Sequence, residues 1–156
     1  MTAFLGFSIG ENLLRYSHSI QADKFLISKK PALRKRTIGA QITTSSNVQF
    51  TPAQLLSGLI LRDPGAARAD KVPSAAHLIA ALGPAAFVGA SFEFVLQNDA
   101  SGAETITLTA DGAKTTMVGT MTVAQNYNKR FLVVVTNVTS SVLAAYSVYS
   151  LGTYVF

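Results

Sequence analysis

Apolar and polar residues alternate along most of the chain after residue 36, with the period of two that is typical of a β-strand with one buried face. Ile38, Ala40 and Ile42 begin the pattern, and turns rich in Gly, Asn and Ser interrupt it. β-Branched and aromatic residues fill the alternating segments, which favours a pleated sheet. The pattern predicts strands at residues 37–43, 48–50, 88–97, 104–109, 115–118, 120–123, 130–138 and 144–151.

One segment has the pattern of a helix instead. Ser74 can accept hydrogen bonds from the free N–H groups of a first turn, and mostly Ala and Leu follow it. Gly83 suits the left-handed position after a helix, and Pro84 cannot continue one. We therefore predict a single short helix between Ser74 and Gly83.

The region before this helix lacks a clear period. Residues 55–61 are an apolar run closed by a turn at residues 62–65, and the residues up to Pro73 are predicted as a loop with alternating charges. Short strands with one inserted helix are typical of an all-β fold, and we predict a single antiparallel jelly roll, which is a β-sandwich. The expected division is a basic N-terminal arm, residues 1–36, and a jelly-roll domain, residues 37–156.

The arm differs from the domain in charge. Residues 1–36 contain seven lysines and arginines and two acids, for a net charge of +5, whereas six bases and six acids cancel in residues 37–156. Most of the arm's bases crowd around Pro31, so this stretch repels itself and is expected to stay extended unless bound. These bases are Lys29, Lys30, Arg34, Lys35 and Arg36.

Three interpretations of the basic arm stay open. Its lysines and arginines could lie along acidic surfaces of neighbouring proteins, or they could form a solvated tail. They could also neutralise phosphates, which would give non-specific, salt-dependent binding to nucleic acid. No aromatic residue is interleaved with them for base stacking, which disfavours recognition of single strands.

Candidate catalytic groups are few. The chain has no Cys, and its two histidines, His18 and His77, fall in the arm and in the predicted helix. A metal site or a catalytic triad needs several converging groups, and no glycine pattern of a phosphate-binding loop occurs. We therefore expect no enzymatic activity, no cofactor and no small-molecule substrate.

Targeting features are also weak. Residues 3–9 are mildly apolar but lack the basic region and the cleavage site of a signal peptide. Residues 78–95 are interrupted by Gly, Pro and Glu93, unlike a membrane helix. Asn137 begins a glycosylation tripeptide, which carries little weight without a secretory route. We expect no export signal.

Three runs in the domain resemble a known family. They are residues 51–64 (TPAQLLSGLILRDP), residues 68–76 (RADKVPSAA) and residues 88–94 (VGASFEF) with Asn98 beyond them. In this order, over roughly residues 50–151, they resemble the small single jelly-roll penton proteins that close the fivefold vertices of large icosahedral DNA viruses such as algal viruses.

The resemblance implies a structural virion protein at the capsid vertex, assembled inside the host cell as a homopentamer. The arm would then contact neighbouring major and minor capsid proteins. Residues 92–96 and 131–135 are apolar on both faces, which is more than a half-solvated sheet requires and favours burial against a neighbour.

Charged residues before the helix are candidate contacts between subunits. Arg62 and Asp63 lie in one turn, and Arg68 and Asp70 lie in the loop that follows. Charge complementarity fixes the orientation of neighbours more than it adds affinity, so these residues could set the register between subunits. The alternative, an internal salt bridge that ties the loop down, stays open.

Two other functions fit a jelly roll. A carbohydrate-binding or host-attachment module, such as a head fibre or decoration protein, would need exposed aromatic residues. The chain has no Trp, and the tyrosines of its domain are Tyr127, Tyr146, Tyr149 and Tyr154. A cupin-like enzyme would need several His ligands, which makes it the weakest alternative.

Overall fold

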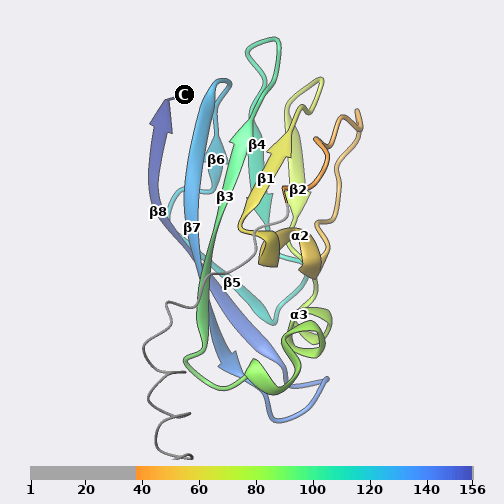
Figure 1. Cartoon of the computed structure of the whole chain (residues 1–156), viewed down its shortest axis with the longest axis vertical. Helices are drawn as coiled ribbons and strands as arrows, with labels where there is room; N and C mark the ends of the chain where they lie inside the picture. Colours follow the sequence, from red (N-terminus) through yellow and green to blue (C-terminus); the bar gives the residue numbers. More distant parts are fainter. Residues whose placement is uncertain (1–37, 156) are drawn as a thin grey trace, which may run out of the picture. The chain divides into compact units, whose positions relative to one another are not determined.

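The computed structural model describes residues 38–155, so the predicted arm lies outside the described residues, as does His18. The described residues form mainly β-strands, with short helices on one side (Figure 1). In chain order the elements are α2 (Pro52–Ser57), β1 (Leu59–Arg62), β2 (Arg68–Lys71), α3 (Ala75–Leu82), the 3-10 helix η1 (Gly83–Ala85), β3 (Ser91–Asn98), β4 (Ile106–Thr109), β5 (Thr115–Val118), β6 (Thr122–Val123), β7 (Tyr127–Asn137) and β8 (Ala145–Val155).

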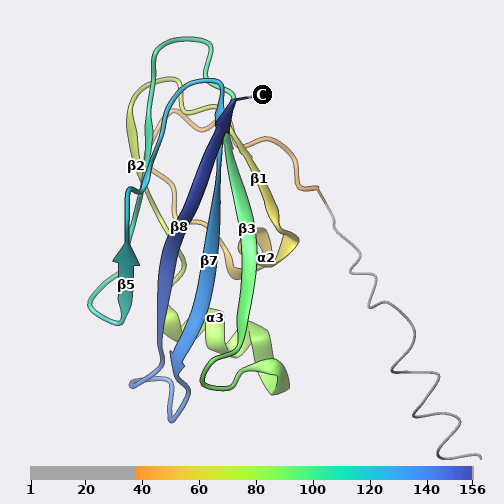
Figure 2. The same cartoon turned by 90° about the vertical axis from the view of Figure 1, so that its left-hand side faces the viewer.

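The strands form two mixed sheets. Five strands lie in the order β1-β3-β7-β8-β5, and three lie in the order β2-β4-β6. One hydrophobic core contains buried side chains of both sheets together with Leu55 of α2 and Leu78 of α3. The sheets therefore pack as the layers of a β-sandwich, with the helices over one part of the core (Figures 1 and 2). The predicted all-β class is confirmed.

The predicted antiparallel arrangement is wrong for half of the strand pairs. β1 runs parallel to β3, β2 runs parallel to β4, and β5 runs parallel to β8. The pairs β3–β7, β4–β6 and β7–β8 are antiparallel. Alternation predicts that a segment is a strand but carries no information about its partner. The direction of the partner depends on the connection between the two strands, and parallel neighbours are joined by long crossovers.

The predicted strands of the second half are confirmed, with shifted ends. β3, β4, β5 and β6 fall within or close to the expected ranges, and β7 and β8 extend to 11 residues each. The first two predicted strands are wrong. Of these ranges, the described residues 38–43 and 48–50 contribute only single parallel bridges, from Ile42 to Arg62 and from Gln49 to Lys71.

The apolar run at residues 55–61 consists of two elements, because Gly58 with φ 84° ends α2 and leads into β1. The Oγ1 of Thr51 accepts from the N–H of Gln54 at 3.2 Å, and the Gln54 side chain accepts from the N–H of Thr51 at 2.7 Å. This is a capping box, with Pro52 at the first helical position. The prediction of one helix is therefore wrong, although α3 begins and ends where expected.

The charged loop predicted before α3 contains β2. Its four residues alternate in burial, and Asp70 is the buried one. A charged residue at an inward position hides the strand pattern, because charged side chains are expected on the exposed face of a strand. The turn between β1 and β2 is confirmed, with Gly65 at φ 61°.

Replacing Thr51 with alanine should lower the free energy of unfolding by about 1 kcal/mol, because the capping box loses its side-chain acceptor. Thr139→Ala is the matched control, since Thr139 is exposed in the loop between β7 and β8, and it should change stability by less than about 0.5 kcal/mol. Urea unfolding followed by circular dichroism measures both. Equal effects would show that the cap does not stabilise the fold.

Candidate assembly surfaces

Arg62 and Asp70 form an ion pair that lies entirely inside the sandwich. Nε of Arg62 is 2.8 Å from Oδ2 of Asp70, and both side chains have a relative exposure of 0%. The pair joins β1 of the larger sheet to β2 of the smaller sheet. Because a contact between subunits needs exposed atoms, the interpretation of these two residues as subunit contacts is corrected. The structure shows the internal salt bridge instead.

The same two side chains also hold the segment before α2. The Nη1 and Nη2 atoms of Arg62 donate to backbone carbonyls, and Oδ1 of Asp70 accepts from the N–H of Val48 at 2.9 Å. The carbonyls belong to Ile42, Thr44, Ser46 and Asp63. We call Arg62, Asp70 and these backbone groups the Arg62 clamp. Each of the three guanidinium nitrogens donates to at least one acceptor, so the buried charge is compensated.

Asp63 and Arg68 lie at the two ends of the turn between β1 and β2. Both are half-buried, and Nε of Arg68 donates to the carbonyl of Pro64 at 3.2 Å. Among residues 38–155, neither Asp63 nor Arg68 belongs to an ion pair. The four charged candidates thus do not form one surface, and contact with a neighbour stays a prediction for Asp63 and Arg68.

Four large apolar side chains are exposed at one end of the sandwich. The loop after η1 and the loop between β7 and β8 both lie at this end, next to α3 (Figure 2). The N–H of Gly89 donates to the carbonyl of Val135 at 2.8 Å, which fixes the first loop against the end of β7. We call these side chains the apolar tip: Phe87 (62% exposed), Val88 (63%), Val142 (77%) and Leu143 (46%).

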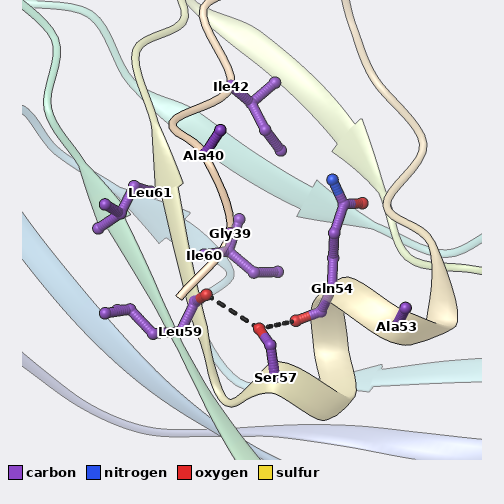
Figure 3. A pocket seen from close by; sticks show the side chains of 9 residues that line it. All are labelled: Gly39, Ala40, Ile42, Ala53, Gln54, Ser57, Leu59, Ile60 and Leu61. Carbon is purple, nitrogen blue, oxygen red and sulfur yellow. Dashed lines mark hydrogen bonds between the residues drawn. The ribbon is translucent and has the colours of Figure 1, made fainter. Parts of the chain in front are cut away.

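An open groove lies on the flank of the sandwich, between residues 39–42, α2 and β1 (Figure 3). Its volume is about 410 Å³ and its walls are mainly apolar, with no charged residue among the described residues that line it. Oγ of Ser57 lies 2.6 Å from the Gln54 carbonyl and 3.1 Å from the Leu59 carbonyl, so this hydroxyl is satisfied within the wall. We call this hollow the β1 groove.

The outward faces of β3 and β7 are partly apolar, as the sequence predicts. Val95, Leu132 and Val134 are half-buried there, beside the ion pair of Glu93 and Arg130, whose atoms are 3.2 Å apart. The inward faces of the same strands carry buried side chains, which include the stacked rings of Phe94 and Phe131. The expected burial of the outward face against a neighbour stays a prediction.

Lys129 is a buried polar residue that sequence reasoning missed. Its side chain lies between the sheets, 4% exposed, and Nζ donates to the carbonyls of Thr120 and Thr122 at 2.8 Å each. Burial lowers the pKa of Lys129, because the interior solvates the ammonium less well than water does. Its place in the alternation could have indicated this burial, because Lys129 precedes the buried Phe131 by two residues and therefore lies on the same inward face of β7.

Tyr146 is a second buried polar group. Its hydroxyl donates to the carbonyl of Pro73 at 2.6 Å, which ties β8 to the residue before the N-cap of α3. Burial raises the pKa of the Tyr146 hydroxyl, because the phenolate would lose its hydration. Tyr146 is therefore a structural residue, unlike the exposed Tyr127, Tyr149 and Tyr154.

The remaining candidate groups do not gather in one place. His77 is exposed in the first turn of α3, and its backbone N–H donates to Oγ of Ser74 at 3.3 Å. Within residues 38–155, no three His, Cys, Asp or Glu side chains are placed to hold a metal ion. In that same part of the chain, no helix has the length and hydrophobicity needed to span a bilayer.

No family model, curated protein or solved structure matches this chain. Its function is therefore inferred from its own residues and surfaces. Among the described residues, the apolar tip and the β1 groove are two of the places where a partner would remove exposed or accessible apolar surface from water, and the end of β8 with Leu151, Tyr154 and Val155 is another.

Proposed function

We propose that the protein is a structural virion protein, a single jelly roll that assembles with copies of itself, as the penton that closes the fivefold vertices of an icosahedral DNA virus. The observation that carries this proposal is the apolar tip, where a monomer in water would leave four large apolar side chains of two neighbouring loops exposed. Two facing sheets with loops at both ends suit a capsid subunit, since such a body offers side walls that pack around an axis.

The residues that resemble penton proteins fall on elements that shape the described domain. Residues 51–64 form α2, β1 and the start of the turn that follows, and residues 68–76 include β2 and the beginning of α3. The first run supplies Arg62 and the second supplies Asp70, so the two halves of the Arg62 clamp come from the two resembling runs. The resemblance thus coincides with the pair that joins the two sheets.

The charge distribution supports a role in assembly. The bases of residues 1–36 give a net charge of +5, whereas residues 37–156 are neutral overall. A neutral body that packs against copies of itself avoids mutual repulsion, and a basic arm fits acidic surfaces of neighbouring capsid proteins. Non-specific contact with nucleic acid is the alternative use of the arm, and a steep salt dependence of DNA binding would indicate it.

The full chain should form a closed oligomer of five copies at neutral pH. Native mass spectrometry and light scattering over a range of protein concentrations measure this directly. A single species of five subunits is the expected result. A monodisperse monomer at the highest concentration, together with no density for this chain at the vertices of particles, would exclude the penton assignment.

A carbohydrate-binding role in host attachment is the second candidate, because three of the four tyrosines in residues 37–156 are exposed. Tyr149 and Tyr154 both belong to β8, where aromatic rings could stack on sugar rings. A glycan array with the full chain distinguishes the two functions. If the full chain is monomeric and binds glycans specifically, and Tyr154→Ala abolishes this binding, host attachment would be favoured over capsid closure.

A further inference from the structure

We propose that the apolar tip of one copy docks in the β1 groove of a second copy. This inference rests on the proposed function, in which the chain assembles with itself, and it names the surfaces that meet. The tip and the groove are built from different elements. The tip comes from the loops that flank β3 and β7, and the groove comes from α2, β1 and residues 39–42.

The two surfaces match in chemistry, and the groove has the volume of a binding pocket. The groove has a volume of about 410 Å³ and is open, which is within the range of pockets that receive apolar groups. Phe87 and Val88 project from the tip with 62% and 63% of their surfaces exposed. Inserting them would bury apolar side chains at both partners, which is the main driving force of association.

The absence of charge on both surfaces favours a second copy over other partners. Residues 83–92 and 131–145, which include both loops of the tip, contain no charged residue. The described residues that line the groove are also uncharged. Docking one on the other therefore desolvates no ionised group among them. A membrane-binding tip typically places basic residues beside its apolar side chains, and these two stretches have none.

The contact would be heterologous, because different surfaces of the two copies meet. A heterologous contact leaves a free tip on one copy and a free groove on the other, so it repeats from subunit to subunit. An isologous dimer would instead bury the same patch on both copies and stop at two. Tip-to-groove docking is therefore the kind of contact that a ring of identical subunits requires.

Phe87→Asp in the full chain tests the proposal. The substitution puts a charge into the tip, and we expect the dissociation constant of the oligomer to rise at least tenfold in sedimentation velocity. Ser101→Asp is the matched control, because Ser101 is exposed in the loop that follows the other end of β3. It adds the same charge and should leave the oligomer unchanged.

Disulfide trapping identifies the groove as the acceptor and does not depend on Phe87→Asp being well folded. The chain has no Cys, so engineered cysteines are the only thiols. Oxidising a mixture of Phe87→Cys and Ala53→Cys chains should give a cross-linked dimer of the two. A mixture of Phe87→Cys with Ser101→Cys chains should give far less, because Ser101 lies outside the groove.

The outcomes separate this inference from the proposed function. If the wild type forms an oligomer that Phe87→Asp leaves intact, and the Phe87–Ala53 pair does not cross-link, tip-to-groove docking is wrong while assembly stands. If the wild type stays monomeric, both are wrong. The wild type could instead bind phosphatidylcholine vesicles. If Phe87→Asp abolishes this binding and leaves the oligomer mass unchanged, the tip is a membrane contact and tip-to-groove docking is wrong.

Discussion

Replacing Arg62 with alanine should lower the free energy of unfolding by about 3–5 kcal/mol, because the substitution leaves the carboxylate of Asp70 buried without its partner. The clamp also loses the donors that hold the carbonyls of residues 42–46. Since domains of this size are stable by about 5–15 kcal/mol, a large share of the stability would disappear. Chemical unfolding in urea, followed by circular dichroism and fluorescence, gives the change.

Lys71→Ala is the matched control for Arg62→Ala. Lys71 also belongs to an ion pair of β2, with Asp111 at 3.7 Å, but its side chain is 55% exposed. An exposed pair contributes about 0–1 kcal/mol, so the control should be mild. Equal losses for the two variants would contradict the assignment of the clamp as a stabilising link. An Arg62→Ala chain that stays fully stable yet fails to assemble would restore Arg62 as an assembly residue.

Raising the pH above 10 should destabilise the protein by up to about 1.4 kcal/mol per pH unit through Tyr146 alone. Burial raises the pKa of Tyr146 above its ordinary value of 10.0. Below pH 10 both the folded and the unfolded chain keep the phenol proton, so Tyr146 contributes no slope there. Above pH 10 the unfolded chain loses the proton first and binds fewer protons than the folded one, so stability falls as the pH rises.

Tyr146→Phe isolates this effect. At pH 7 the variant should lose about 1 kcal/mol, because the hydrogen bond to the Pro73 carbonyl is gone. Above pH 10 its stability should fall less steeply than that of the wild type. Lys129 acts in the opposite direction, since its lowered pKa makes stability rise with pH up to about 10.5. Lys129 is present in both proteins, so its contribution cancels in the difference between their stabilities. Identical slopes for wild type and variant would contradict the prediction.

Local structure was predictable wherever a local signal decides it. The period of two placed β5, and the capping residues Ser74 and Gly83 set the ends of α3. α2 was also encoded, by the capping box of Thr51 and Gln54 and by Pro52 at the first helical position, but the apolar run that follows lacks a clear period and no helix was predicted there.

The pairing of strands and the burial of charge were not predictable in the same way. Arg62 follows the buried Ile60 by two residues, so the alternation of β1 places it inward, yet its charge favoured a surface position. Only Asp70, eight residues further along and on the other sheet, makes that burial possible. The β1 groove likewise exists only where three separate segments meet. Such features depend on tertiary contacts that no local pattern contains.

The Arg62 clamp has a mechanical consequence. Residues 42–48 are fastened to both sheets, by backbone hydrogen bonds to β1 and β2 and by the side chains of Arg62 and Asp70. Because Ile42 pairs in parallel with Arg62, a pull on the chain ahead of Ile42 along β1 would load its backbone hydrogen bonds to Leu61 and Asp63 in shear. Thr44, Ser46 and Val48 add further bonds to Arg62 and Asp70, so a tether attached at this end would pull on both sheets and not on β1 alone.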